Sequence, residues 1–456
     1  MAFQLQPWRR KHRFRTRFAA LAAVVVALIA ATSACGGLAG TASPGAARRA
    51  PMGSMLMHDN RMQDPRSRYL YVWAGTDGRT KPDRLLTFNF DPGSPQYGKL
   101  VADTIIPGPG GAGNEPHHCG LSANGLVLAC GGLLSSLRNQ NTLFFFSLKN
   151  PAHPVLFSSQ RTPLAAFPDA FIPLPDNGFL VSEMGSLDGG APGRVAEFSG
   201  ADKLVGMYPA NPPQAFNPHG MDIRPDANLM VTCDYVEPAS TLNATPGPVL
   251  YRSTVRIWNF RHRAVVKTIT LPSGAVSMDC LLVPKNKQDL GYVGGTGNGE
   301  LYLFNPNAGT AEPVFDFDSL TPDAQTQVMA VSADGSRLFV PYQSPTGQGG
   351  VAMLDISHPS HPRLLFNLNL GEGSGPHMAM LAGNGTQLVV TDYFLNEDNF
   401  GKLHFDGDHF VRVIDIGADR LRLDPRFQVN MNTLIPGVRL RPHGTAAIGM
   451  TMGTAG

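Results

Sequence analysis

Short apolar stretches separated by Asn, Asp and Gly recur along this chain from about residue 68 onward. Five of them share one layout, in which a short strand and a polar turn precede a more apolar strand. They lie at 116–132, 168–185, 218–235, 327–343 and 376–393. Asn, Asp and Gly tolerate the positive φ angles of tight turns, so each unit predicts a β-hairpin. A looser copy lies at 276–295, and 442–450 matches a first strand with no second strand after it.

A second pair of apolar strands follows each hairpin, which gives a repeat of four strands. Near the N-terminus, the lone strand 68–75 precedes another such pair at 84–106. Together with the C-terminal strand at 443–450, these strands complete a seventh set of four. Radial repetition of four-stranded sheets is typical of propellers, and closing the ring protects the strand edges. The sequence therefore predicts an all-β, seven-bladed β-propeller over 68–456, closed by N- and C-terminal strands in one blade.

The N-terminal part of the chain carries a different pattern. A basic stretch that begins at Arg9 precedes an apolar run at 18–34, which ends in small residues before Cys35. This order predicts a signal peptide over 1–35 and lipidation of Cys35. Ordinary cleavage nearby and an uncleaved anchor are the alternatives. We expect an exported protein of the periplasm or cell envelope that meets the membrane only through this end, with a flexible linker at 36–67.

The charge distribution bears on the class of partner. The formal net charge is +2, and six of the positive charges lie within the first 17 residues. The rest of the chain has no basic surplus, so we expect no nucleic-acid partner. The 50 glycines and 38 prolines are dispersed rather than gathered in one tail, which is typical of many short strands joined by turns.

Strand direction in a propeller brings distant residues to one opening of the ring. The first strand of each blade runs beside the central channel and the second returns antiparallel to it, so first-strand starts and second-strand ends share one mouth. The first-strand starts carry His117, His118, Asp169, His219, His377 and His443. The second-strand ends carry Glu183, Asp234, Tyr235, Tyr342, Asp392 and Tyr393. We expect the histidines, which come from four blades, to converge at this mouth.

Converging imidazoles are typical of a metal site. Imidazole binds copper, iron and zinc, and a ring of histidines with open positions can hold a redox metal for oxygen chemistry. The predicted metal ligands are His117, His118, His219, His377 and His443. One of the adjacent pair should point away, because successive strand residues face opposite sides. Histidines that recur by duplication can instead cap or pack the repeated strands, and the sequence leaves both interpretations open.

Four cysteines lie within the predicted propeller. In the first hairpin, the turn at 124–125 places Cys119 opposite Cys130 on paired strands. Directly opposed residues can reach disulfide distances, and an exported protein occupies an oxidising compartment, so we predict a disulfide. A thiolate metal ligand is the alternative for this pair. Cys233 and Cys280 lie near the same mouth on neighbouring blades, and their state is left open.

Seven segments of the propeller match motifs of one known family in the same order. They lie at 90–100, 116–122, 224–235, 254–271, 354–364, 374–378 and 412–427. The chain resembles the selenium-binding protein family, which includes the methanethiol oxidases. The resemblance implies a seven-bladed propeller that uses copper and, as in the best-described members, oxidises methanethiol to formaldehyde, hydrogen sulfide and hydrogen peroxide. His117 and His118 match a histidine pair of the family, and His443 lies within a residue of another family histidine.

Three hypotheses about function follow. The first is an exported, copper-dependent oxidase of a small thiol, in which Asp234 or Asp392 moves protons. In this hypothesis Asp234, Asp392 and Glu183 are also the partners that fix the imidazole tautomers. The second is a non-catalytic, lipid-anchored propeller that binds a ligand or a protein partner through its loops. The third is an iron dioxygenase of the four-histidine propeller type, with iron in place of copper. Fold alone does not separate these hypotheses, because propellers host both enzymes and binding modules.

Overall fold

A computed structural model describes residues 65–76, 80–242, 247–345, 348–382, 385–393, 396–397, 403–404 and 407–449. The predicted signal peptide, its Cys35 and most of the predicted linker lie outside these residues. Within the described part of the chain, no helix is both long and apolar enough to cross a membrane.

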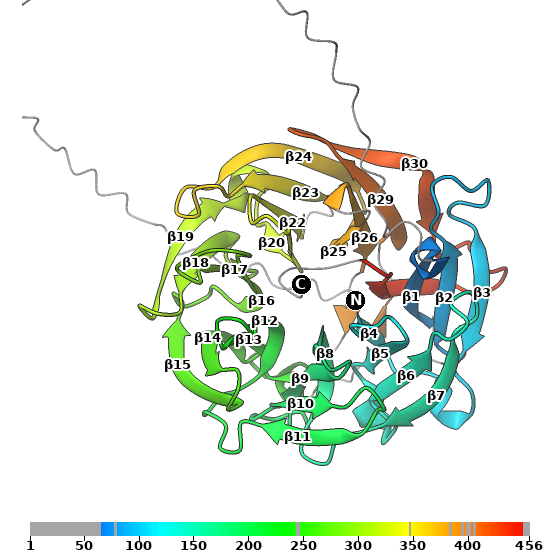
Figure 1. Ribbon diagram of the computed structural model, residues 1–456, viewed down its shortest axis with the longest axis horizontal. Helices are drawn as coiled ribbons and strands as arrows, with labels where there is room; N and C mark the ends of the chain where they lie inside the picture. Colours follow the sequence, from blue (N-terminus) through cyan, green and yellow to red (C-terminus); the bar gives the residue numbers. More distant parts are fainter. Residues whose placement is uncertain are drawn as a thin grey trace, which may run out of the picture. The chain divides into compact units, whose positions relative to one another are not determined.

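Seven antiparallel sheets are arranged in a ring (Figure 1). The innermost strands are β4 (Pro116–Leu121), β8 (Ala166–Pro173), β12 (Pro218–Arg224), β16 (Ser277–Leu282), the split pair β20 (Gln325–Thr326) and β21 (Ala330–Val331), β25 (Pro376–Ala382) and β31 (Leu440–Ala446). The second strands are β5 (Val127–Gly132), β9 (Phe179–Gly185), β13 (Leu229–Val236), β17 (Gly291–Gly295), β22 (Arg337–Gln343), β26 (Gln387–Asp392) and β1 (Tyr69–Thr76). The predicted seven-bladed propeller is confirmed.

The third and fourth strands complete each blade toward the rim. The third strands are β6 (Leu143–Ser147), β10 (Arg194–Phe198), β14 (Tyr251–Asn259), β18 (Glu300–Asn305), β23 (Gln348–Asp355), β29 (Phe410–Ile416) and β2 (Arg84–Asn89). The outer strands are β7 (Val155–Gln160), β11 (Leu204–Tyr208), β15 (Ala264–Thr270), β19 (Thr310–Asp316), β24 (Arg363–Glu372), β30 (Leu421–Asn430) and β3 (Leu100–Ile105). Connections hold the short helix α1 (Pro238–Leu242), the small hairpin of β27 (Asn396–Glu397) and β28 (Leu403–His404), and 3-10 turns η2 (Pro65–Arg68), η4 (Pro109–Gly111), η5 (Ser135–Arg138) and η6 (Phe317–Ser319).

Strands from both ends of the chain close the ring in one blade. This sheet has the order β3-β2-β1-β31, and Tyr71 pairs with Ala446 while Thr76 pairs with Leu440. The predicted closure is therefore confirmed, although β31 begins and ends earlier than the predicted span 443–450. A closed ring leaves no innermost edge free for pairing with another chain.

The hairpin turns carry the residues that their geometry demands. Gly125 and Gly335 adopt φ angles of 68° and 71°, and Asn177 and Asn228 adopt 72° and 53°. Gly and Asn reach this left-handed region at low cost, which is why the repeating polar turns along the sequence identified the hairpins.

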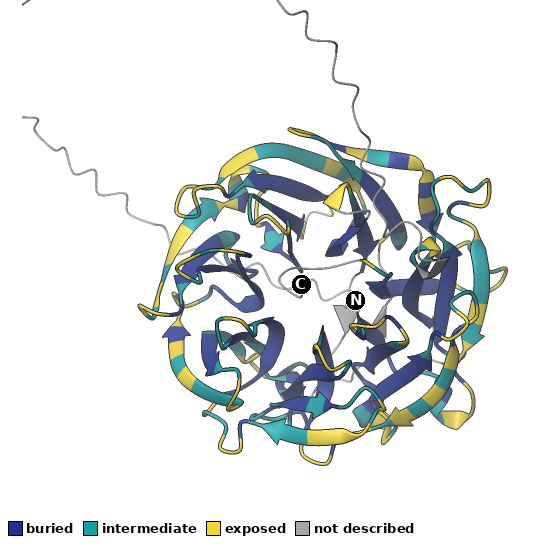
Figure 2. Cartoon of the chain, in the orientation of Figure 1, coloured by how far each residue is buried: buried dark blue, intermediate teal, exposed yellow. Residues whose placement is uncertain are grey.

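The hydrophobic core lies between neighbouring blades. Figure 2 shows buried inner strands and a partly exposed rim, where outer strands such as β7 alternate exposed and half-buried residues. Trp73 joins the closing blade to the next one: its ring centroid lies 5.4 Å from that of Phe144 and 5.7 Å from that of Phe146. Its indole Nε1 donates a hydrogen bond to the carbonyl of Gly131 at 2.7 Å, so the polar group of this large buried side chain has a partner.

Candidate metal centre

A β-bulge at the start of the innermost strand presents the site residues to the axis. In the β4–β5 pair, Pro116 pairs with Gly132 and Cys119 with Cys130, so two histidines stand opposite the single residue between those partners. An extra residue bends the strand and re-aims its side chain, and bulges are frequent next to active sites. In five blades a proline, which has no N–H for the ladder, precedes the bulge, and the first bulged residues of the other four are Asp169, His219, His377 and His443. The bulge of β16 instead follows Ser277 and begins at Met278.

One carboxylate, that of Asp169, binds three imidazoles. Its Oδ2 lies 2.6 Å from Nε2 of His117 and 2.9 Å from Nε2 of His219. Its Oδ1 lies 3.3 Å from Nδ1 of His118. Asp169 is 1% exposed, so it needs these donors to remain charged inside the protein. Burial alone would raise the pKa of Asp169, but the neighbouring His219, His118 and His117 hold it well below its ordinary value.

Two further imidazoles close the cluster on the other side. Nδ1 of His377 donates to Oε1 of Gln327 at 2.8 Å, which leaves the lone pair of His377 on Nε2. Nδ1 of His118 faces Asp169, which leaves its lone pair on Nε2 as well. These two Nε2 atoms lie 3.4 Å apart. The ring centroid of His443 is 4.5 Å from that of His377 and 4.8 Å from that of His118.

Several ring nitrogens in the cluster are buried without a protein partner. Nδ1 of His117, Nδ1 of His219 and both nitrogens of His443 accept or donate no hydrogen bond within the described residues. All three side chains are nearly inaccessible, so each unpartnered nitrogen carries a desolvation cost. Two groups, His117 with His118 and His443, and His117 with Asp169 and His219, have potential ligand atoms within 4.8 Å of one another.

Three of the imidazoles, those of His117, His377 and His443, are held in the neutral form. Burial lowers the pKa of His117 to about 4. Burial, with neighbouring imidazoles, lowers the pKa of His377 and of His443 well below the ordinary value. A metal binds the neutral imidazole, so these side chains need lose no proton at neutral pH before they act as ligands.

The five predicted histidines do converge, but the expectation for the adjacent pair was wrong. His117 and His118 both enter the cluster, with their rings stacked at a centroid distance of 4.6 Å, and both approach Asp169. The strict alternation of side chains fails here because both residues lie in the β-bulge, where the ladder is interrupted.

The predicted carboxylates of the second strands occupy structural positions. Asp234 accepts hydrogen bonds from Nε of Arg256 at 2.7 Å and from the hydroxyl of Thr254. Asp392 pairs in the same way with Arg412. Each arginine lies on the adjacent third strand, so these carboxylates tie the second strand to the third within one blade. Their predicted role in proton transfer stays a prediction.

Sequence reasoning did not assign a role to two residues of the cluster, Asp169 and Gln327, or to the nearby carboxylate of Asp279. Asp169 was expected at the mouth without a function, and it proves to be the shared anion. Gln327 stands in the gap of the split innermost strand, where its blade has no histidine. Asp279 on β16 accepts the backbone N–H of Met329, and burial raises its pKa to about 7. The signal that could have identified Asp169 is its place directly after a proline at the start of a repeat, where four other repeats carry a histidine.

The cysteines fall into two pairs. Cys119 and Cys130 are joined in a disulfide between β4 and β5, with a Cα–Cα distance of 4.1 Å. This bond leaves neither sulfur as a thiolate ligand beside the histidines. Cys233 and Cys280 are buried thiols, and both donate toward the carbonyl of Gly220.

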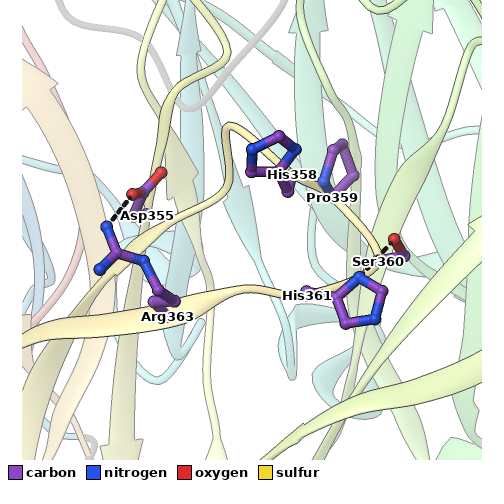
Figure 3. Close-up of a pocket in the computed structure, with 6 residues that line it drawn as sticks. All are labelled: Asp355, His358, Pro359, Ser360, His361 and Arg363. Atoms are coloured by element: carbon purple, nitrogen blue, oxygen red, sulfur yellow. Dashed lines mark hydrogen bonds and ion pairs between the residues drawn. The ribbon is translucent and has the colours of Figure 1, made fainter. Parts of the chain in front are cut away.

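A surface pocket of about 460 Å³ also carries two histidines (Figure 3). It lies at the turn between β23 and β24, where Asp355 pairs with Arg363 at 2.7 Å. Nδ1 of His361 forms a hydrogen bond with the hydroxyl of Ser360, and the His358 ring lies apart from the His361 ring in Figure 3. Because third strands end away from the starts of innermost strands, this pocket opens at the other end of the ring from the axial cluster.

Comparison with known proteins relates the chain to one group. No family model matches the sequence. Methanethiol oxidase of Hyphomicrobium sp. is 23% identical over 385 residues, which covers 80% of this chain and 84% of the relative. Selenium-binding protein 2 of Mus musculus is 24% identical over 445 residues, which covers 84% of this chain and 90% of the relative.

Solved structures show the same fold. A hypothetical selenium-binding protein from Sulfolobus tokodaii matches with a TM-score of 0.72 at 16% identity, over 86% of this chain and 96% of that one. A putative 6-phosphogluconolactonase from Bacteroides fragilis matches with a TM-score of 0.56 at 14% identity, over 84% and 97% of the two chains. Over most of its length, the chain is thus similar in sequence to methanethiol oxidases and selenium-binding proteins, and it shares the propeller fold of the solved selenium-binding protein.

Proposed function

We propose that this protein is a copper-dependent oxidase of a small thiol, with the metal held by the axial histidines. The observation that carries the proposal is the pair of lone-pair-bearing Nε2 atoms of His118 and His377, which face each other at 3.4 Å. Ligand nitrogens around one first-row ion, at bond lengths near 2.0–2.1 Å, lie roughly 3–4 Å apart. His443 and His117 border the same point and have unpartnered nitrogens to offer.

The residues present fit such an ion. Neutral imidazoles are the ligands that copper and iron accept, and the charge of Asp169 would orient three of the rings and balance part of the metal charge. A bound ion would also satisfy some of the nitrogens that are otherwise buried without a partner, at most one in each ring. Copper at this site would supply one-electron chemistry and a position for both sulfur and dioxygen.

The surroundings of the cluster favour a small, partly apolar substrate. Met278, Val328, Met378 and Met380 form a buried apolar group that Tyr235 also contacts. The Tyr235 ring lies 5.0 Å from that of His219, so this group borders the imidazoles. A methyl or other short alkyl group on the thiol is chemically suited to such a surface, because contact with it leaves no polar group unpaired. Methanethiol, named for the relatives, is the first substrate to test.

Proton transfer and location complete the proposal. Asp279, with its pKa near 7, can hold or release a proton close to neutral pH, whereas Asp234 and Asp392 are already bound by arginines. We also propose export through the N-terminal segment, with copper rather than iron as the cofactor. The Cys119–Cys130 disulfide supports export, because disulfides persist in oxidising compartments.

The test is metal analysis of protein purified without added metal, together with consumption of methanethiol. We expect about one copper per chain, lost in His377→Ala and in His443→Ala together with turnover. His361→Ala, at the exposed turn of Figure 3, is the matched control and should retain both. Iron in place of copper would favour the dioxygenase. Wild-type protein without metal, or variants that keep it, would overturn the proposal and favour a binding propeller.

A further inference from the structure

A buried phenol, carboxylate and guanidinium lie against the histidine cluster on the side of His443. The Tyr393 ring stacks on the His443 ring at a centroid distance of 3.7 Å and an interplanar angle of 26°. Its hydroxyl donates to Oε1 of Glu115 at 2.7 Å. Oε2 of Glu115 pairs with Nη2 of Arg441, whose guanidinium carbon lies 5.3 Å from the centroid of the Tyr393 ring. All of these side chains are buried.

We propose that Tyr393, fixed by Glu115 and Arg441, is the positioning residue that sets the ring orientation of His443. No hydrogen bond from the described residues orients His443, whereas Asp169 orients His117 and Gln327 orients His377. Ring stacking takes over that function, and a stacked ring can impose a plane only if it is itself held. The bond to Glu115 supplies this restraint.

The backbone at Glu115 supports the proposal independently. Glu115 has a φ of 54°, in the left-handed region that residues other than Gly, Asn and Asp rarely adopt. Such strain persists where the surrounding structure over-determines it, and it is concentrated at functional sites. In this conformation the carboxylate of Glu115 meets the guanidinium of Arg441. Glu115 lies two residues before His117 in the sequence, and Arg441 lies two residues before His443. The ion pair of Glu115 with Arg441 therefore links the chain segments that carry these two histidines.

This inference rests on the proposed metal site, so the experiment has one arm without metal. In metal-free protein labelled with ¹³C-histidine, the stacked Tyr393 ring should shift the His443 ring signals upfield. Tyr393→Leu should abolish this shift. Tyr393→Phe should keep the stacked ring but broaden the His443 signals, because the phenylalanine ring lacks the hydrogen bond to Glu115. Tyr342→Phe, which also removes one buried tyrosine hydrogen bond, to Asn367, is the matched control and should change nothing at His443.

The second arm uses Co²⁺ as the probe, with chelator competition and the visible spectrum as readouts. Tyr393→Leu should weaken Co²⁺ binding by about 10–100-fold, as loss of a residue that orients a ligand commonly does, and alter the spectrum. Tyr393→Phe should lie between that variant and wild type. Unchanged His443 signals and unchanged affinity in Tyr393→Leu would overturn the inference. Wild-type protein that binds no Co²⁺ would instead overturn the proposed metal site, while the metal-free arm still decides whether Tyr393 orients the ring.

Discussion

Replacing Glu183 by Gln should stabilise the protein at neutral pH. Glu183 is fully buried at the end of β9, and its Oε1 has no hydrogen-bond partner within the described chain. Its Oε2 meets the Thr162 hydroxyl at 2.7 Å, and that hydroxyl also lies 2.8 Å from the carbonyl of Ala165. A hydroxyl has one proton to donate, so the second contact needs a proton from the carboxyl group. Burial accordingly raises the pKa of Glu183 to about 8.

The size of the effect follows from linkage. The folded protein binds a proton at Glu183 more tightly than the unfolded chain, whose ordinary value is 4.5, so the free energy of unfolding falls as pH rises from 4.5 through 8. At pH 7 the loss is about 3 kcal/mol. Gln is uncharged and matches the shape of the protonated carboxyl group. Glu183→Gln should therefore equal the wild type near pH 4 and exceed it by about 3 kcal/mol at pH 7.

The measurement is denaturant unfolding of both proteins at several pH values between 4 and 8.5. Glu197→Gln is the control, because Glu197 lies in the same blade and keeps an arginine partner, Arg263, at 2.8 Å. The free energy of unfolding of Glu197→Gln, relative to the wild type, should not rise toward neutral pH. A Glu183→Gln difference that stays constant across this range would refute the assignment of a neutral carboxyl group.

Three further variants test the architecture. Gly444→Ala would place a Cβ 2.5 Å from the carbonyl oxygen of His117 and 2.8 Å from the amide nitrogen of Cys119, so we expect a loss of about 1–3 kcal/mol and of bound metal; normal metal content would contradict this contact. Cys119→Ala with Cys130→Ala opens a disulfide across a separation of 11 residues and should cost about 3 kcal/mol in chemical unfolding, whereas an unchanged midpoint would show that the bond does not constrain the chain. Removal of 440–456 deletes β31 and should yield insoluble protein, and a soluble, cooperatively unfolding product would refute closure of the ring by that strand.

The blades could be predicted from the sequence because the information that specifies them is local. A turn residue that tolerates positive φ, such as Asn177 or Gly335, lies between two apolar strands in each hairpin. Each repeat corresponds to one sheet, so the number of repeats gives the number of blades. The closing pair was accessible for the same reason, since the strand at the C-terminus lacked a partner of its own.

The site was predictable only in part because its decisive features are not local. The five histidines could be placed at one mouth from strand direction alone. The bulge could not, because it is defined by which residues of the partner strand pair, as Pro116 and Cys119 do with Gly132 and Cys130. The network of Glu115, Tyr393 and Arg441 joins three blades through side chains, and no spacing within one repeat reveals it.

The closing blade has a consequence for the order of events during synthesis. Each ordinary blade can form from a continuous segment as the chain emerges, since its contacts are close in sequence. The pairing of Tyr71 with Ala446 must wait until the C-terminal strand is complete, and that same strand carries His443. The imidazole cluster therefore forms only after β31 has paired with β1. A chain in which this pair has not formed lacks one wall of the cluster, so any ion that needs all of its ligands would be taken up only after the ring has closed.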